Sequence, residues 1–301
     1  YGLVGSEMCI RDRSEIVDEE YKKQIMFLLN NNWTGRTDYY FPAQTSINVE
    51  RSHFSKLRDY NYVFVKKNTV DTRRAILFTF LNTAAENTAV IILKDLTIYS
   101  ININCSYEYF HGSIFDISYS DSEIVIYDSF MAAGNKINSM QYTDRACEAS
   151  YFISNIVKSS IPVLCATYFF NLSEVSELVD NEEIFMIPNN LPITTGINYS
   201  CFKWKPPEKM MFSLMITEQD TDINLYTTNF KKLTLFATIK ENTELGGNEI
   251  SKIKDLAGYK CGCVVDFNIA EDKIVAIGVR DDKTIPTTIR SIEKILHIKR
   301  E

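Results

Sequence analysis

The sequence predicts an α+β protein with a large domain of antiparallel sheets followed by a smaller β domain. Residues 60–130 consist of short apolar segments, rich in β-branched and aromatic residues, that alternate with polar turns, as in antiparallel sheets. Residues 14–31 and 141–157 instead place their apolar residues at helical spacing. After residue 230 a second series of short strands begins. These three observations define the fold class.

The large domain begins with a helix over 14–31, where an acidic first turn precedes the apolar positions. A Pro-led extended segment, a short strand and a short helix follow over 41–58. The remaining elements expected in this domain are strands at 62–67, 74–81, 89–94, 97–103, 110–117 and 123–130 and helices at 141–157 and 171–181.

The stretch "CFKWKPPEKMMFSLMI" (201–216) predicts a strand that a proline pair interrupts. The polar residues 217–229 predict a boundary, so we expect a large domain over 14–220 and a small one over 221–301. Strands near 231–240, 259–267 and 273–280 and a final helix fill the small domain, which suits a β-barrel of the OB type.

Residues 1–13, "YGLVGSEMCIRDR", resemble a translated adapter and show no periodicity that leads into the rest of the chain. We expect this segment to be an artefact of sequence assembly, and we leave it out of the fold prediction. Another domain is then expected upstream.

Composition excludes several classes of function. With a net charge of −7, the chain does not hold nucleic acid through overall positive charge, so an anionic partner must meet a local basic site. Three histidines make a His-based metal site or triad unexpected. The scattered cysteines suit a reducing compartment, not secretion, and no segment approaches the length of a membrane span.

Two clusters of cations follow predicted strands. In "FKWKPP", Lys203 and Lys205 share one face of a strand and the two aromatic residues share the other, so two ammonium groups lie side by side where a phosphate can bind. In "VRDDKTIP", Arg280 and Lys283, with Asp282 to orient them, can form a phosphate clamp. Solvated surface lysines and a charged surface turn are the alternatives.

Three further segments contain candidate site residues. Lys66 and Lys67 end a predicted strand, and because neighbouring side chains point to opposite faces, only one of them can enter a pocket. Asp128 ends another strand, as a site residue or a turn cap. Gly112 stands inside a predicted strand, which indicates a bulge or a close backbone approach.

Taken in chain order, four segments resemble the lysine-dependent nucleotidyltransferase superfamily and, within it, the mRNA guanylyltransferases (mRNA capping enzymes), over residues 41–298. They are "FPAQTSINVERSHFSKLRDYNYVFVKK", "VIYDSFMAAGNKI" followed by "YTDR", "FKWKPP" and "VRDDKTIP". The last two are the more specific, because polynucleotide ligases usually lack the tryptophan and prolines around this K-x-K.

The resemblance implies a ligase-type (ATP-grasp-like) nucleotidyltransferase domain with a C-terminal OB-fold lid. It implies that Lys67 attacks GTP with Mg²⁺ or Mn²⁺ and then passes GMP to the 5′-diphosphate end of RNA. Phosphate-binding roles fall on Arg73, Gly112, Asp128, Lys203, Lys205, Arg280, Asp282 and Lys283. RNA triphosphatase and methyltransferase domains or subunits are expected partners, in the nucleus of a cell or in the cytoplasm for a large DNA virus.

The chain departs from the family pattern at three motifs. "KKNTVDTRR" lacks the Asp-Gly after the lysine, Ser113 stands where a glutamate is expected, and Asn190 and Leu191 stand where an acidic residue and a glycine are expected. The metal ligands are therefore not assigned, with Asp116, Glu123 and Asp128 as candidates. Two hypotheses follow: an active guanylyltransferase, or a degenerate subunit that binds nucleotide or RNA 5′ ends within a capping complex. A polynucleotide ligase is a third.

Overall fold

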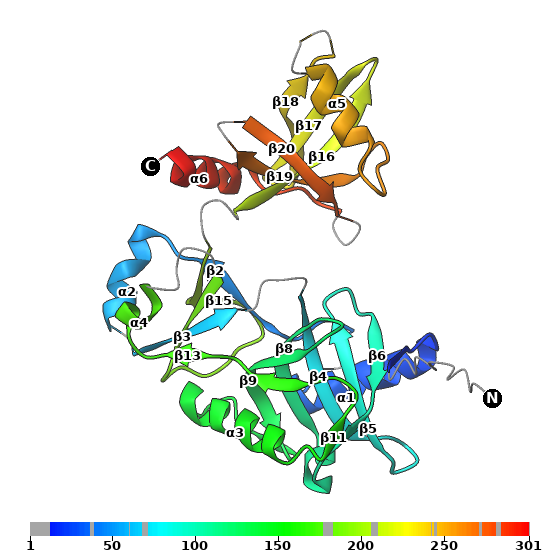
Figure 1. The fold of residues 1–301 in the computed structure, drawn as a ribbon, viewed down its shortest axis with the longest axis vertical. Helices are drawn as coiled ribbons and strands as arrows, with labels where there is room; N and C mark the ends of the chain where they lie inside the picture. The colour runs from blue at the N-terminus through cyan, green and yellow to red at the C-terminus, as the bar shows by residue number, and fades with distance from the viewer. Residues whose placement is uncertain are drawn as a thin grey trace, which may run out of the picture. The chain divides into compact units, whose positions relative to one another are not determined.

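The computed structural model divides the chain into two compact units, residues 1–204 and 205–301 (Figure 1). It describes residues 13–36, 39–59, 61–67, 72–176, 183–205, 210–241, 243, 246–270, 273–280 and 284–300. The mixed α+β architecture with mainly antiparallel sheets confirms the predicted fold class.

Unit 1 contains an eight-stranded sheet, here called sheet A, in the order β1-β6-β5-β4-β8-β9-β10 with β12 paired to β9. Its strands are β1 (Arg13–Glu15), β4 (Arg73–Leu81), β5 (Asn87–Leu93), β6 (Ile98–Ile101), β8 (Ser113–Tyr119), β9 (Ile124–Ala132), β10 (Asn135–Lys136) and β12 (Val163–Cys165). A separate two-stranded ladder joins β7 (Ile103–Asn104) to β11 (Lys158–Ser159).

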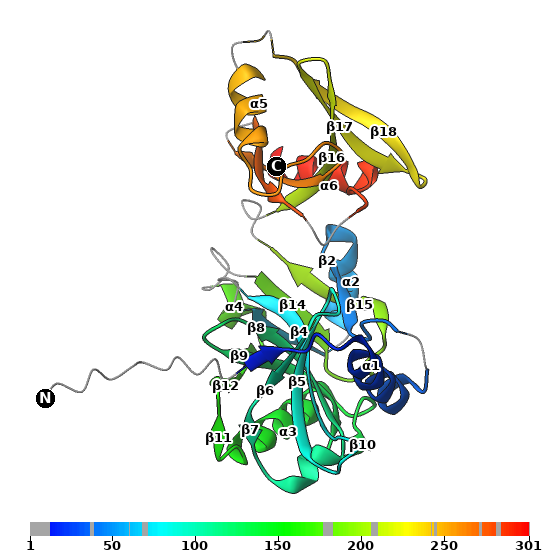
Figure 2. The ribbon, with the colours of Figure 1, turned by 90° about the vertical axis from the view of Figure 1, so that its right-hand side faces the viewer.

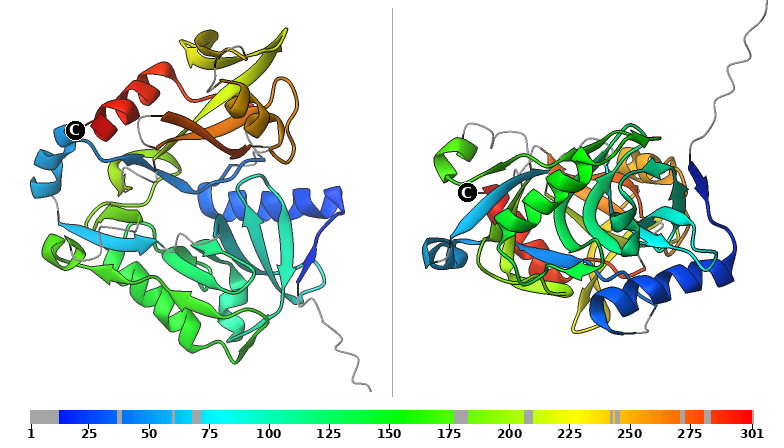
Figure 3. Two further views of the ribbon diagram at one scale, coloured as in Figure 1. Left: turned by 45° about the horizontal axis from the view of Figure 1, so that its top comes forward. Right: turned by 90° about the horizontal axis from the view of Figure 1, so that it is seen from below.

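Sheet A is buried on both faces because a helix covers each one. On β4, Ile76 and Phe78 pack against α1 (Glu19–Thr34), whereas Ala75 and Leu77 belong to the cluster that contains residues of α3 (Tyr142–Ser154). Figures 2 and 3 show α1 in blue and α3 in green on different sides of the sheet. This double coverage explains why β4 is a continuous apolar run and does not alternate.

A second sheet of unit 1, here called sheet B, has the order β13-β3-β14-β15-β2. Its strands are β2 (Gln44–Asn48), β3 (Tyr62–Lys67), β13 (Tyr168–Phe169), β14 (Glu183–Pro188) and β15 (Gly196–Trp204), and the short helices of this region are η1 (Arg51–His53), α2 (Phe54–Asp59) and α4 (Leu172–Ser176). β2 and β15 pair in parallel, as do β9 and β12, and the other pairs are antiparallel.

Several predicted boundaries in unit 1 require correction. The first helix begins at Glu19, not at residue 14, because the Asp18 carboxylate caps it by accepting from two backbone N–H groups, and Ser14 lies in β1. The predicted strand 110–117 begins instead at Ser113, after a 3₁₀ turn, η2 (Tyr107–His111). The predicted helix 171–181 is described only as α4, and its later residues lie outside the described part of the chain.

The contacts of Arg13 bear on the segment expected to be an artefact. Arg13 lies in β1, donates a hydrogen bond to the Tyr119 hydroxyl and forms an ion pair with Asp121 at 2.6 Å. Residues 1–12 lie outside the described residues, so the expectation for them stays a prediction.

Unit 2 is an antiparallel five-stranded sheet, here called sheet C, in the order β18-β17-β16-β19-β20. Its elements are β16 (Met211–Gln219), β17 (Asp222–Asn229), β18 (Lys232–Ile239), α5 (Gly246–Lys254), β19 (Val264–Ala270), β20 (Lys273–Val279) and α6 (Ile289–Arg300). α5 and α6 contribute isoleucines to the single cluster of buried residues that includes Phe212 and Phe267.

The division between the units lies 16 residues before the predicted boundary at 220/221, since unit 2 begins at Lys205. The polar stretch 217–229 is not a linker but the end of β16 and all of β17. Its polar groups are buried because they have partners: the Thr227 hydroxyl donates to the Thr287 carbonyl at 2.6 Å. The predicted closed barrel is likewise not seen among the described residues, where β18 and β20 are both edge strands.

Within the described residues, no helix is both long enough and apolar enough to cross a membrane.

Candidate active site

One face of sheet B carries a row of polar side chains beside buried apolar ones. Lys67 is directly opposite Glu183 in the register of β3 and β14, and Phe185 is opposite Lys203 in that of β14 and β15. Because alternate residues share a face, Lys67 and Lys203 project from the same side. Phe202 and Trp204 pack in a different cluster on the reverse side, as the sequence predicts for this strand.

Sheet A contributes an arginine and a carboxylate that face the same space. Arg74 on β4 holds Asp116 on β8 in a bidentate pair, with Nε–Oδ1 at 3.0 Å and Nη2–Oδ2 at 2.5 Å. Arg73 belongs to the opposite face, where its guanidinium lies 5.7 Å from the centre of the Tyr119 ring. The arginine that reaches the site is therefore one residue later than the predicted one.

Lys67, Arg74, Asp116 and Asp128 line one cavity between the two sheets, together with residues of β2, β8, β9 and β14. Its volume is about 40 Å³, room for a few water molecules. Sites for drug-sized ligands are several-fold larger, roughly 300–1,000 Å³. A ligand of nucleotide size therefore does not fit unless the ion pairs at the wall of the cavity rearrange.

Lys67 occupies a partly buried, charged environment. Its Nζ lies 2.8 Å from Glu183 Oε2 and 5.8 Å from the centre of the Phe185 ring. Burial and, after it, the positive charge of Arg74 lower the pKa of the Lys67 ammonium, and the charge of Asp116 opposes them. A lysine of lowered pKa provides more free amine at neutral pH and is a better nucleophile.

Lys203 shares this electrostatic environment. Burial lowers its pKa, and the charges of Lys67, Arg74 and Lys94 lower it further, so three other cations lie within electrostatic reach of Lys203. Lys94 follows Leu93, which is opposite Ala75 on β4, so it is the cross-strand neighbour of the Arg74 position. Sequence analysis did not identify Lys94, because it stands in an unremarkable turn.

Asp128 is held by a second arginine. Arg145 of α3 binds it with both Nε and Nη2, at 2.8 and 3.0 Å, and also donates to the Met140 carbonyl. Burial raises the pKa of the Asp128 carboxyl above its ordinary value, and the charge of Arg145 opposes this. Asp128 lies opposite Asp116 in the register of β8 and β9, so each carboxylate of this like-charged pair has its own guanidinium.

The carboxylates at the cavity offer a divalent ion only part of a site. Among the described residues, no three His, Cys, Asp or Glu side chains come together as a metal site. Mg²⁺ is commonly bound through one or two carboxylates together with the phosphates of a substrate. Asp116 lines the cavity, and Glu183 lies 2.8 Å from Lys67, which also lines it, so these two carboxylates fit this arrangement.

The remaining predicted residues are not brought to this cavity by the described part of the chain. Gly112, at φ +115°, accepts a hydrogen bond from Gly134 N at 2.9 Å, the predicted close backbone approach, but does not line the cavity. Lys205 follows the last residue of β15 and begins unit 2. Arg280 lies in unit 2, with Nη1 2.8 Å from Asp266 Oδ2. Asp282 and Lys283 lie outside the described residues.

Glu183 is the functional candidate that sequence reasoning missed. The expected acidic position was placed near 188–195, but the carboxylate beside Lys67 stands at the start of β14. Its signal is an acidic residue directly before a buried strand, "EEIFMIP". Ser113, where a glutamate was expected, is buried and has a structural role, because its hydroxyl donates to the Tyr109 carbonyl and accepts from Ala133 N.

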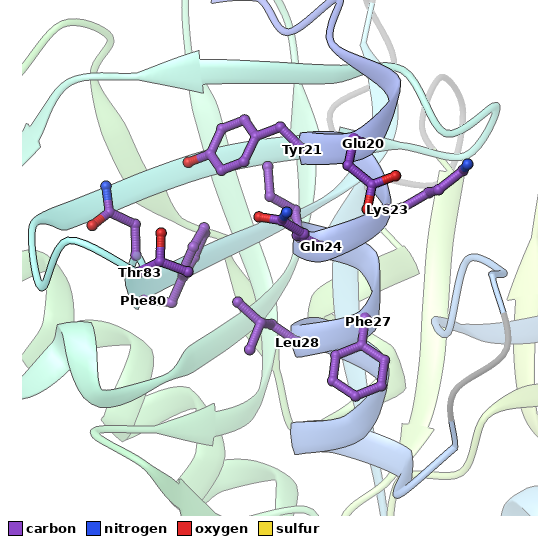
Figure 4. A pocket seen from close by; sticks show the side chains of 10 residues that line it. Glu20, Tyr21, Lys23, Gln24, Phe27, Leu28, Phe80 and Thr83 are labelled. Carbon is purple, nitrogen blue, oxygen red and sulfur yellow. The ribbon is translucent and has the colours of Figure 1, made fainter.

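A larger cavity, about 420 Å³, lies between α1 and the turn after β4 (Figure 4). Its wall includes Tyr21, Phe27, Leu28 and Phe80, with Glu20 and Lys23 as the charged residues. No cluster of like charges converges there. Its size alone does not make it a reaction site, and the chemistry favours the smaller cavity.

No family model matches the chain, and no curated protein matches it. Solved structures to which it is similar include DNA ligases. A mycobacterial DNA ligase D complexed with ATP and MES is 9% identical, with a TM-score of 0.45 over 80% of this chain and 95% of that one. The bacteriophage T7 ligase in complex with ATP is 9% identical, with a TM-score of 0.38 over 79% and 98%. A Lig E DNA ligase is 9% identical, with a TM-score of 0.38 over 80% and 99%. At these identities and scores the likeness does not assign an activity.

Proposed function

We propose that this chain is a guanylyltransferase that transfers GMP from GTP, through a covalent lysyl–GMP on Lys67, to the 5′-diphosphate end of RNA. The observation that carries the proposal is the position of Lys67. Its amine is partly buried in a cavity, its pKa is lowered, and two further cations, Arg74 and Lys203, lie within electrostatic reach. A lysine nucleophile for phosphorus needs this combination.

In the first step the Lys67 ammonium loses a proton, and Glu183, 2.8 Å away, is positioned to accept it. The free amine then attacks the α-phosphorus of GTP, a P–N bond forms, and the bond to the leaving pyrophosphate breaks. Loss of the proton also ends the ion pair between these two side chains. The lysine is thereby released from β14 and can reach the nucleotide.

The cations of the site stabilise the negative charge on the phosphate oxygens during the reaction. Lys203 and Lys94, whose charges act on each other, are suited to the phosphate oxygens. Mg²⁺ or Mn²⁺ would be held by Glu183 or Asp116 together with the phosphates, and when bound it neutralises charge on those oxygens.

In the second step a terminal oxygen of the RNA 5′-diphosphate attacks the phosphorus of lysyl–GMP. The P–N bond breaks, and the Lys67 amine recovers a proton. Unit 2 is proposed to supply the lid that the resemblance implies, and its five antiparallel strands with a helix between β18 and β19 support an OB-type assignment. Arg280, half-exposed beside Asp266, is its proposed phosphate ligand.

A degenerate binding subunit is the second candidate. It is favoured by one observation: the ion pair between Lys67 and Glu183 stands at a cavity too small for a nucleotide. The absence of Asp-Gly after Lys67 agrees with it. In this case the cations bind nucleotide or RNA 5′ ends and no covalent adduct forms.

Incubation with α-labelled GTP or ATP and Mg²⁺ or Mn²⁺ distinguishes the candidates. The guanylyltransferase proposal predicts a labelled protein band with GTP that pyrophosphate removes. Labelling by ATP alone would indicate a ligase-like activity and contradict the proposal. GTP binding without any labelled band would favour the binding subunit.

A further inference from the structure

The turn between β17 and β18 has an unusual backbone for its sequence. Asn229 and Lys232 form the last pair of the hairpin, so Phe230 and Lys231 make a two-residue loop. Both have left-handed backbone angles, with φ +46° and +66°. Such loops are normally formed by Asn-Gly or Gly-Gly, because a side chain is strained in this conformation. The hairpin therefore carries an aromatic and a lysine where a stable turn would not select them.

Phe230 is also almost fully exposed, at 93%, the highest value among the exposed large hydrophobic residues of the described chain. Figure 2 shows the β17–β18 hairpin in yellow, extending from the rest of unit 2. A ring in this position gains no burial to offset the strain of its backbone. Backbone strain that local packing does not explain is a mark of functional segments.

Apart from Asp222, at the far end of β17, the charged residues of the hairpin lie at the same turn. Between residues 223 and 239 the charged side chains are Lys231 and Lys232, and both residues are exposed. This stretch contains no acidic residue, in a chain whose net charge is −7. On the edge strand β18, Leu233 and Leu235 are also half-exposed. The turn thus combines an aromatic ring with two lysines, in a stretch that contains no carboxylate of its own.

We propose that this turn, Phe230–Lys232, is a contact site for single-stranded RNA, on which a base stacks against Phe230 while Lys231 and Lys232 bind the backbone phosphates. Charge complementarity decides the occupant: an exposed ring followed by two exposed lysines matches a chain of bases and phosphates. The inference rests on the proposed function in one respect only: the choice of RNA over DNA as the nucleic acid comes from that proposal. It concerns the body of the strand, and not its 5′ end.

The test is the affinity for a 3′-fluorescein RNA of about 10 nucleotides, measured by anisotropy. Phe230→Ala is expected to weaken binding about 10-fold, as for loss of one stacked base. Phe230→Tyr keeps the ring and should retain the affinity. Lys231→Ala with Lys232→Ala should lower the slope of log affinity against log salt by about 1.4. Lys240→Ala, which removes an exposed lysine beyond the other end of β18, should change the affinity far less.

A further variant separates binding from folding. Phe230→Asn with Lys231→Gly installs the residues that this turn prefers, so it should raise the melting temperature of unit 2 while it weakens RNA binding. Lysyl–GMP formation should be unchanged in every hairpin variant, and RNA binding is measurable even if no lysyl–GMP forms. Affinity equal to the parent protein in both Phe230→Ala and the Asn-Gly variant would overturn the inference and leave a protein partner as the occupant of the turn.

Discussion

Two arginine–aspartate pairs lie side by side on sheet A and have different environments. Arg145 and Asp128 are almost completely buried, with side-chain exposures of 1% and 6%. Arg74 and Asp116, directly across the β8–β9 ladder, have exposures of 31% and 13%. Both pairs are bidentate, and both carboxylates line the cavity that contains Lys67.

The difference indicates which pair is structural. Arg145 is fixed by a third bond to the Met140 carbonyl, and its helix α3 packs against β9, so this pair ties a helix to the sheet. Arg74 instead directs its charge toward Lys67 and Lys203 and influences the pKa of both. The same two chemical groups thus tie a helix to the sheet in one place, whereas in the other the arginine lowers the pKa of two neighbouring lysines.

The largest expected effect is on stability. Arg145→Met leaves the Asp128 carboxylate buried without its guanidinium, and we expect it to lower the free energy of unfolding by about 3–5 kcal/mol. Urea denaturation of unit 1 measures this. As the control, Arg145→Met combined with Asp128→Leu removes both charges and should recover most of the loss. If Arg145→Met alone lowers the free energy of unfolding by less than about 1 kcal/mol, the pair of Arg145 and Asp128 does not have a structural role.

The equivalent change in the other pair should affect chemistry more than stability. Arg74→Met is expected to cost about 1 kcal/mol of stability, since the pair is partly solvated. It should reduce labelling by GTP at least about 10-fold, because the site loses a positive charge that lowers the pKa of Lys67. Arg73→Met is the matched control, because Arg73 lies on the other face against Tyr119. If Arg73→Met abolishes labelling and Arg74→Met does not, the assignment of Arg74 to the cavity is wrong and Arg73 is the arginine that acts there.

The smallest expected effect is a shift in pH dependence. The charge of Asp116 raises the pKa of Lys67, so Asp116→Asn should lower that pKa further. Labelling requires the free amine, whose fraction increases with pH, so the rising limb of the labelling rate should move to lower pH in this variant. Asp121→Asn, a change at an exposed residue that pairs with Arg13, should leave the profile unchanged. A shift to higher pH in Asp116→Asn would contradict the electrostatic account.

Sequence patterns predicted the elements whose burial is set locally. β3 (Tyr62–Lys67) lies where its apolar run predicts it. The alternation of side chains also correctly predicts that Phe202 and Lys203 point to opposite faces of β15. The boundary between the units was mispredicted because Thr227 and Asn224 are polar but buried. The Thr227 hydroxyl donates to the carbonyl of Thr287, and the Asn224 amide oxygen accepts from Thr238 on the neighbouring strand. Local composition does not reveal these hydrogen bonds.

The candidate site was predictable only in part, for a related reason. Lys67 follows from its place at a strand end, but its carboxylate partner, Glu183, is 116 residues away and is brought to it by the pairing of β3 with β14. Whether Arg73 or Arg74 faces the cavity depends on which face each side chain of β4 takes, and the family pattern alone did not fix that register. Long-range pairing and register therefore decide the details of the site.

Mass spectrometry of the protein after incubation with GTP and a divalent metal tests the central claim most directly. The account predicts a single added GMP, mapped to a peptide in which Lys67 carries the phosphoramidate, absent in Lys67→Ala and retained in Lys66→Ala. GMP on Lys66 or on any other residue, or an adduct that persists in Lys67→Ala, would contradict the assignment of Lys67 as the nucleophile.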